Sequence, residues 1–187
     1  MNVNEQKCIA KNVLDVLKLL DYRAIIAGGA ARDWYSDKLA TDIDIFMYVE
    51  WSGRVGKKRY VERVSNLLKL LLNVDNINVV GNIDEDDGLN YIKNPDIVSV
   101  LEFVKNDVKF QIILMTKQNV DVTKFAFNIC QAWSNGEYVA TTEAFKIGMK
   151  KKIIIETGTL YANGKKYREK IKSKFPDFDF VDIKNLY

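Results

Sequence analysis

The stretch AIIAGGAARDWYSDKLATDIDIF, residues 24–46, concentrates glycine, arginine and aspartate in an order that suits phosphate chemistry. Paired glycines let the backbone turn sharply and let a bulky ligand approach bare peptide, and Gly28-Gly29 directly precedes a segment that we expect to begin a helix. The first N–H groups of a helix lack partners and attract anions, usually phosphate. Arg32 adds a planar fork of donors that matches phosphate oxygens. The sequence therefore predicts a phosphate-binding turn.

A pair of aspartates follows this turn in the segment Asp42-Ile43-Asp44-Ile45-Phe46. Side chains alternate along a strand, so Asp42 and Asp44 share one face while Ile43 and Ile45 point into the core. Adjacent carboxylates repel, and a hard divalent cation relieves the repulsion. Mg²⁺ typically takes one or two carboxylates together with substrate phosphates, and Mn²⁺ is the alternative ion. A phosphate-binding turn beside a metal platform indicates phosphoryl or nucleotidyl transfer.

The segment GGAARDWYSDKLATDID resembles the head-domain signature of the nucleotidyltransferase superfamily, in the branch of tRNA nucleotidyltransferases and bacterial poly(A) polymerases. That branch carries Gly-Gly-x-x-Arg-Asp, a fixed gap, and then Asp-x-Asp. Ser36-Asp37 and Ala40 depart from the common residues of the branch at positions that carry no chemistry. Singly, Gly-Gly is commonly a plain turn and Asp-x-Asp a solvated strand end, but the joint spacing favours function. The matching positions, without insertion or deletion, are Gly28, Gly29, Arg32, Asp33, Asp42 and Asp44.

The resemblance implies an α/β (α+β) nucleotidyltransferase fold, a short mixed β-sheet with helices packed on it and a basic helical C-terminus. It also implies transfer of a nucleoside monophosphate from a nucleoside triphosphate to an acceptor hydroxyl, with release of pyrophosphate. Gly28, Gly29 and Arg32 would bind the triphosphate, and Asp33 would orient Arg32 or the turn. Asp42 and Asp44 would act in catalysis by holding the metal ion.

A β-hairpin is predicted for residues 97–105 and 108–115, because Asn106-Asp107 between them is a favoured two-residue turn. With that turn, Phe103 faces Phe110 and Glu102 faces Gln111. Many nucleotidyltransferases carry a third carboxylate on the strand beside Asp-x-Asp, where this chain has Gln111. Glu102 is the alternative catalytic acid, although a plain surface pair is equally compatible. The substitution keeps a second function open, a catalytically silent relative that binds a nucleotide, RNA or a host protein.

Residues 121–133, DVTKFAFNICQAW, are predicted to form a helix. They are weakly similar to the family motif Arg-Arg-Asp-Phe-Thr-x-Asn, which contacts the sugar and base of the nucleotide. Phe125 and Asn128 match this motif, whereas Thr123 and Lys124 depart from it. Asn128 is accordingly a candidate nucleotide-binding residue, and an ordinary amphipathic helix is the alternative.

Apolar periodicity predicts helices over residues 5–20 and 59–73, and short strands over 24–27, 42–46 and 77–80. Residues 82–90 predict a mobile acidic loop rather than a calcium site. With 187 residues and 48% hydrophobic composition, we expect a nucleotidyltransferase core over 1–135 and an extension over 136–187 packed on it. Histidine is absent, which excludes histidine-based catalysis, and Cys8 and Cys130 are expected to be reduced.

The extension is rich in lysine, with interleaved aromatic residues, and suits a phosphate backbone and stacked bases. RNA or tRNA is therefore a possible acceptor bound by this region, although a solvated helix face explains the same lysines. The sequence shows neither a bilayer-spanning run nor a signal-peptide pattern, so we expect a cytoplasmic location, in the host cytoplasm if the source is viral. The chain is similar to small free-standing nucleotidyltransferases encoded by bacteriophages and by toxin–antitoxin loci.

Overall fold

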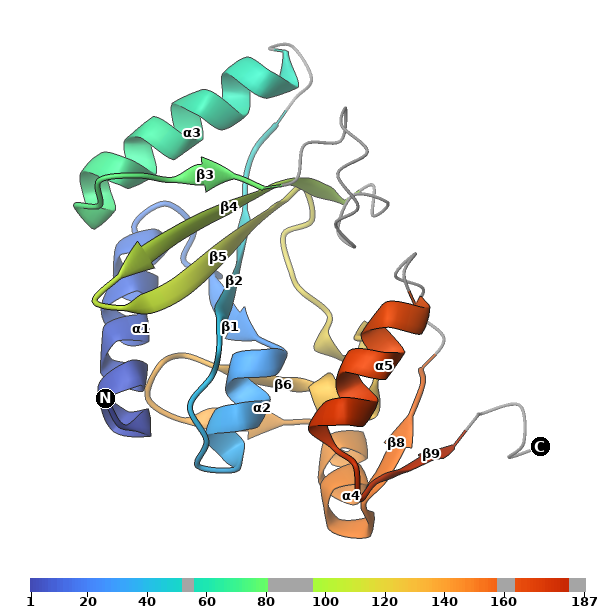
Figure 1. Ribbon diagram of the computed structural model, residues 1–187. Helices are drawn as coiled ribbons and strands as arrows, with labels where there is room; N and C mark the ends of the chain where they lie inside the picture. Colours follow the sequence, from blue (N-terminus) through green and yellow to red (C-terminus); the bar gives the residue numbers. More distant parts are fainter. Residues whose placement is uncertain (52–55, 81–95, 158–163, 182–187) are drawn as a thin grey trace.

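The computed structural model describes residues 1–51, 56–80, 96–157 and 164–181, and for residues 164–166 it describes the backbone alone. A seven-stranded mixed sheet with the order β3-β4-β5-β2-β1-β6-β7 forms its centre, and β8 and β9 form a separate pair (Figure 1). The fold class predicted from the sequence is confirmed. The acidic loop predicted over 82–90 lies outside the described residues. The strands are β1 (Ile25–Ala27), β2 (Ile43–Tyr48), β3 (Asn78–Val79), β4 (Ile97–Lys105), β5 (Val108–Met115), β6 (Ala132–Ser134), β7 (Val139–Thr141), β8 (Ile153–Ile155) and β9 (Asp179–Val181).

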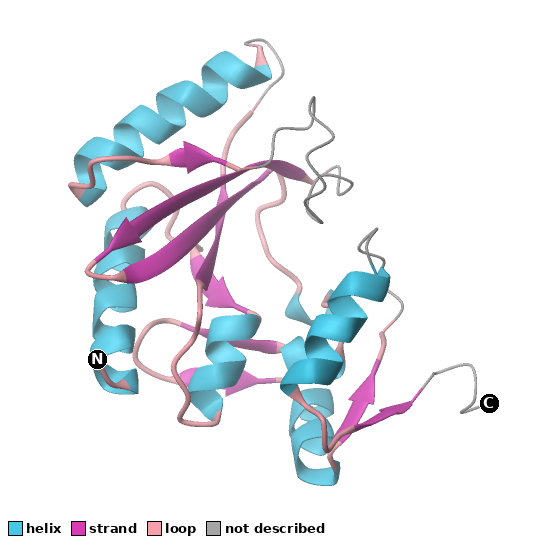
Figure 2. Cartoon of the chain, viewed as in Figure 1, coloured by secondary structure: helices cyan, strands magenta, loops and turns pink. Residues whose placement is uncertain are grey.

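Helices cover both faces of the sheet, as Figure 2 shows in cyan. In Figure 1, α1 and α3 lie to the left of β2, and α5 lies to the right with the β8–β9 pair. No helix in the described part of the chain has the length and apolar character of a membrane span. The helices are α1 (Val3–Lys18), α2 (Gly29–Tyr35), α3 (Lys57–Leu72), α4 (Glu143–Lys151) and α5 (Gly164–Lys174), with two 3₁₀ turns, η1 (Val122–Lys124) and η2 (Asn128–Cys130).

The long N-terminal helix α1 begins with a capping box. The Asn2 side chain accepts a hydrogen bond from the Glu5 backbone N–H, and Glu5 accepts one from the Asn2 backbone N–H. Its apolar face is buried at Val13, Leu14 and Leu17, and packs on the sheet. The helical spacing of these residues explains why α1 and α3 both form within about two residues of their predicted bounds.

The hairpin of β4 and β5 has the predicted turn and register. Asn106 and Asp107 both adopt left-handed backbone conformations, with φ of 50° and 62°, as a two-residue type I′ turn requires. Phe103 pairs with Phe110 and Glu102 with Gln111, so the register prediction is confirmed. β5 then runs parallel to β2, which places the hairpin directly beside the Asp-x-Asp strand.

The predicted helix over residues 121–133 is wrong. The chain there forms η1 and η2 and then the strand β6, which pairs antiparallel with β1. The continuous segment 125–132 is buried, whereas an amphipathic helix would bury only one face. A short extended strand satisfies β1, whose free edge needs hydrogen-bonding partners, and this tertiary demand overrides the local helical pattern.

The two faces of the sheet bury different clusters of side chains. Ile43 and Ile45 of β2 point to the face covered by α1 and α3, as the alternation predicted. Phe46 points to the other face and packs against Phe125, with 5.7 Å between the ring centroids. Strand β7, from the predicted extension over 136–187, pairs with β6 in the main sheet. The division of the chain at residue 135 stays a prediction.

Candidate functional site

The glycine turn connects β1 to α2 and closes tightly. Gly28 has φ of +83°, a left-handed conformation that side chains other than glycine rarely adopt. Its N–H donates to the Ala132 carbonyl at 2.8 Å, and its own carbonyl accepts from the Arg32 N–H at 3.0 Å. The turn is thereby fixed to β6 on one side and to α2 on the other.

Arg32 is buried, with 4% of its surface exposed. Its Nε donates to Asp33 Oδ1 at 3.0 Å, and its Nη1 contacts Cys130 Sγ at 3.6 Å. The guanidinium carbon lies 5.3 Å from the centroid of the Phe175 ring. The Nη2 atom lies beside the turn, 3.8 Å from where a Cβ would stand on Gly29. The structure therefore points one end of the arginine fork at the predicted phosphate-binding turn.

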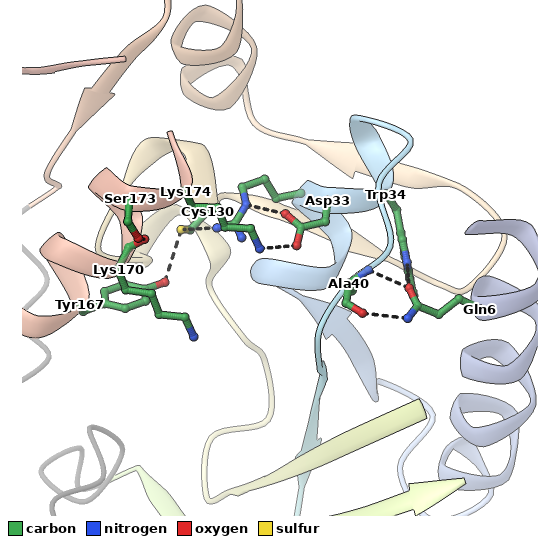
Figure 3. A network of polar contacts seen from close by, with 10 residues as sticks. Gln6, Asp33, Trp34, Ala40, Cys130, Tyr167, Lys170, Ser173 and Lys174 are labelled. Carbon is green, nitrogen blue, oxygen red and sulfur yellow. Dashed lines mark hydrogen bonds and ion pairs between the residues drawn. The ribbon is translucent and has the colours of Figure 1, made fainter. Parts of the chain in front are cut away.

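Asp33 is buried between two cations (Figure 3). While Oδ1 accepts from Arg32, Oδ2 pairs with Lys174 Nζ of α5 at 2.5 Å. The expected contact between Asp33 and Arg32 is present, and Lys174 extends it into the C-terminal helix. Both carboxylate oxygens of Asp33 are engaged, so Asp33 acts here by holding its neighbours in place.

A second network in Figure 3 fixes the loop between α2 and β2. Gln6 of α1 accepts hydrogen bonds from Trp34 Nε1 at 2.8 Å and from the Ala40 N–H at 2.9 Å, and its Nε2 donates to the Ala40 carbonyl at 2.9 Å. All three residues are buried. Because Ala40 is anchored two residues before Asp42, this network sets where the Asp-x-Asp strand begins. No sequence pattern marks Gln6, because its role depends on the packing of α1.

Asp44 carries an unneutralised buried oxygen. The residue as a whole is half-buried, but its Oδ1 atom is buried and has no hydrogen-bond partner among the described residues. Burial, and then the charge of Asp42, raise the pKa of the Asp44 carboxyl to about 7, while Lys170 and Arg32 act in the opposite direction.

Two neighbouring carboxylates with an unsatisfied oxygen fit a hard divalent cation such as Mg²⁺. In the described part of the chain, no third histidine, cysteine or acidic side chain completes a metal-binding group. The remaining ligands of a cation held here would therefore come from water and substrate, which is the usual situation for Mg²⁺.

Gln111 occupies the position beside Asp44 where a third acid would complete the metal site. Its Nε2 donates to Glu102 Oε2 at 3.0 Å, and Lys109 Nζ lies 2.7 Å from the same oxygen. Burial alone would raise the pKa of Glu102, but these hydrogen bonds lower it below its ordinary value. Glu102 is thus on the same sheet face as Asp44, with Gln111 between them. Its predicted catalytic role stays a prediction.

One cavity of about 400 Å³ brings most of these groups together. Its polar wall comes from the glycine turn, the Asp-x-Asp strand and Gln111, and its apolar wall includes the rings of Phe46 and Phe125. The opposite side is formed by α5, for which the sequence predicted only a basic region. The lining residues are Ala27, Gly28, Gly29, Arg32, Asp33, Thr41, Asp42, Asp44, Phe46, Gln111, Phe125, Ala126, Cys130, Tyr167, Lys170, Ile171 and Lys174.

Asn128 is not among the residues that line this cavity. Its Nδ2 donates to the carbonyls of Ala144 at 3.3 Å and Ile153 at 3.2 Å, and its Oδ1 accepts from the Ile155 N–H at 2.8 Å. The side chain thus ties η2 to α4 and β8. This geometry supports a structural task for Asn128, and its contact with a nucleotide stays a prediction.

The chain shares its fold with the head domain of CCA-adding enzymes. No family model and no curated protein sequence matches it, but solved structures do. A structure titled tRNA-processing enzyme (apo form I) matches with a TM-score of 0.56 and 14% identity over 92% of this chain and 43% of that chain. The Thermotoga maritima CCA-adding enzyme complexed with tRNA matches with a TM-score of 0.54 and 15% identity, over 97% of this chain and 42% of that chain. A tRNA-processing enzyme with CTP matches with a TM-score of 0.54 and 14% identity, over 90% and 43% of the two chains.

This chain therefore spans less than half of the length of those enzymes. At such low identity the likeness concerns the fold, so the chemistry has to be argued from the site.

Proposed function

We propose that this protein is a Mg²⁺-dependent nucleotidyltransferase that moves a nucleoside monophosphate from a nucleoside triphosphate to an acceptor hydroxyl. The observation that carries the proposal is the convergence of the glycine turn, Arg32, Asp42 and Asp44 on one cavity. Structures that share the fold hold CTP or tRNA, which makes RNA the first acceptor to test. Mn²⁺ is the alternative metal ion, since the same oxygen ligands suit it.

The reaction requires the acceptor oxygen to attack the α-phosphorus of the triphosphate. A new P–O bond forms, the bond from the α-phosphorus to the bridging oxygen breaks, pyrophosphate leaves, and the hydroxyl proton passes to solvent. Gly28-Gly29 and the free end of Arg32 would orient the phosphates, which is the main contribution in chemistry governed by positioning. Asp42 and Asp44 would hold the metal ion. When bound, Mg²⁺ screens the phosphate charge and lowers the pKa of the attacking hydroxyl.

A second candidate is a catalytically silent module of the same fold that binds a nucleotide, RNA or a host protein. One observation favours it, the amide of Gln111 beside Asp44 with Glu102 committed to Lys109 and Gln111. An amide cannot replace the charge of a carboxylate, so a second metal ion would be poorly held. This arrangement allows nucleotide binding to persist without transfer.

The experiment that separates the two candidates is a transfer assay. The protein, Mg²⁺ and each of the four nucleoside triphosphates labelled at the α-phosphate are incubated with tRNA, total RNA and a protein extract. We expect label in RNA and release of pyrophosphate, and we expect Asp44→Asn to abolish both. Asp37→Asn is the matched control, since Asp37 is exposed and asparagine tolerates its φ of 53°. Binding of a triphosphate without transfer to any acceptor would overturn the enzyme in favour of the silent module.

A further inference from the structure

One face of α5 is built into the cavity wall. The four α5 residues that line the cavity are Tyr167, Lys170, Ile171 and Lys174. Their spacing of three, four and seven residues from Tyr167 places them on the same face of a helix. The face is therefore continuous and looks across the cavity at the glycine turn and the Asp-x-Asp carboxylates.

This face is held in place at several points. Ile171 is buried with 2% of its surface exposed, and the ring of Tyr167 packs on Phe127 with 5.5 Å between centroids. After the helix, Phe175 lies under the Arg32 guanidinium, and β9 pairs with β8. α5 is thus a fixed wall of the site, from which the exposed side chain of Lys170 extends.

The two lysines of the face differ in what they contact. Lys174 Nζ pairs with the buried carboxylate of Asp33. Lys170 makes no ion pair with any residue that the structure describes, although it lines the same cavity. In Figure 3 its side chain extends away from α5 and takes part in none of the drawn contacts. Lys170 is exposed, and an ammonium at the wall of a partly apolar cavity favours an anionic ligand.

We propose that Lys170 is a substrate-binding residue that contacts the phosphate chain of the nucleoside triphosphate from α5. Lys174 would act differently, as a positioning residue that holds Asp33 and, through it, Arg32. This inference rests on the proposed function, because it assigns a role within the same site.

The charge of the site explains why such a residue is needed. A triphosphate carries several negative charges, and Asp42 and Asp44 add two more to the cavity. Since the described residues provide a two-carboxylate metal platform, a single divalent cation with Arg32 leaves much of this charge uncompensated. A cation on the opposite wall would act at short range on phosphates bound in the cavity and offset part of their charge.

The test compares Lys170→Met with Lys172→Met. Lys172 lies on the same helix, and its Nζ lies 5.0 Å from the centroid of the Phe180 ring and outside the cavity lining, so both variants lose one charge from α5. Binding of Mg-ATP, Mg-CTP, inorganic tripolyphosphate and adenosine is measured by calorimetry. We expect Lys170→Met to lower the affinity for the two nucleotides and for tripolyphosphate about tenfold or more, as for loss of a charge-assisted hydrogen bond. The affinity for adenosine should stay unchanged. Lys170→Arg should restore most of the affinity, and Lys172→Met should match the wild type.

Two outcomes overturn the assignment. Equal triphosphate affinity in Lys170→Met and Lys172→Met would show that Lys170 is a solvated lysine, while leaving the proposed function intact. If Lys170→Met lowered the affinities for adenosine and for triphosphate equally, and Lys170→Arg did not restore them, Lys170 would have a structural role. Conversely, a wild type that binds triphosphates but transfers nothing would overturn the proposed reaction alone, because the binding comparison still holds. Lys170→Gln serves in place of Lys170→Met if the latter melts at a lower temperature than the wild type.

Discussion

Asp33 and Asp44 line the same cavity, yet their surroundings are opposite. Asp33 is paired through both oxygens, with Arg32 and with Lys174. Asp44 has a buried oxygen without a partner and a pKa raised to about 7. A buried carboxylate that is already neutralised serves the architecture, whereas one left unneutralised at a cavity wall is available to a ligand. The contrast separates the structural part of the site from the part that would meet metal and substrate.

The largest loss of stability is expected from Asp33→Asn, which breaks the ion pair between Arg32 and Asp33. The substitution leaves Arg32 buried without a countercharge, and loss of one partner of a buried ion pair costs about 3–5 kcal/mol. Lys174 is half-exposed and can return to water, so we expect the lower end of this range. Urea denaturation measures the change, with Asp37→Asn as the exposed control. A loss below about 1 kcal/mol would mean that water already screens the Arg32–Asp33 pair.

Asp44→Asn should, in contrast, increase the stability of the protein when metal is absent. At pH 8 with a chelator, removal of an unneutralised buried charge is expected to raise the melting temperature by a few degrees, at about 2–4 °C per kcal/mol for a chain of this size. With Mg²⁺ and nucleoside triphosphate at about a hundredfold excess over Kd, the wild type gains about 2.7 kcal/mol and the variant should gain nothing. Thermal shift assays with and without Mg²⁺ check both statements. A nucleotide-induced shift that ignores Mg²⁺ and survives the substitution would contradict the metal assignment.

The pH dependence of stability sharpens the same comparison. In the folded protein the Asp44 carboxyl has its pKa near 7, above the ordinary value of about 3.9 in the unfolded chain, so between these values the folded state holds a proton that the unfolded state releases. The contribution of Asp44 to the free energy of unfolding is therefore present at low pH and lost as the pH rises from about 4 to about 7. Its slope is at most about 1.4 kcal/mol per pH unit.

The measurement is the difference in unfolding free energy between wild type and Asp44→Asn, taken at several pH values in a chelator. We expect the difference to move in favour of the variant as the pH rises towards 7 and then to level off. A difference independent of pH would place Asp44 in solvent. Because only deprotonated carboxylates bind a metal ion, Mg²⁺ affinity should rise over the same pH interval.

The smallest change in stability and activity is expected from Glu102→Gln. Glu102 lies two strands from Asp44, and its partners Lys109 and Gln111 are partly exposed, so the loss of stability should stay below about 1 kcal/mol. Transfer activity should change little, since Gln111 stands between Glu102 and Asp44. Activity assays on Glu102→Gln, beside the exposed control Glu62→Gln, decide the matter. A large fall in transfer in the first variant alone would establish Glu102 as the third acid.

Local sequence patterns determined the helices, strands and turns that depend on interactions between residues close together in the chain. Asn106-Asp107 demanded a two-residue turn, and the turn fixed the register that places Glu102 opposite Gln111. Helical spacing determined α1 and α3, and the Gly-Gly and Asp-x-Asp spacing determined that a turn and a strand carry the polar groups of the cavity. These features depend on neighbouring residues, which the sequence places next to each other.

Tertiary structure decided the rest, because the partners are distant in the chain. Residues 121–133 became turns and a strand because β1 needed a hydrogen-bonding neighbour at its edge. Asp33 and Asp44 have the same side chain, but only Asp33 meets Lys174, which packing of α5 brings across the cavity. Whether an aspartate is neutralised or left to raise its pKa depends on the burial and charges around it in space. The sequence contains both carboxylates. The docking of α5 neutralises Asp33 through Lys174, whereas Asp44 keeps an oxygen without a hydrogen-bond partner among the described residues.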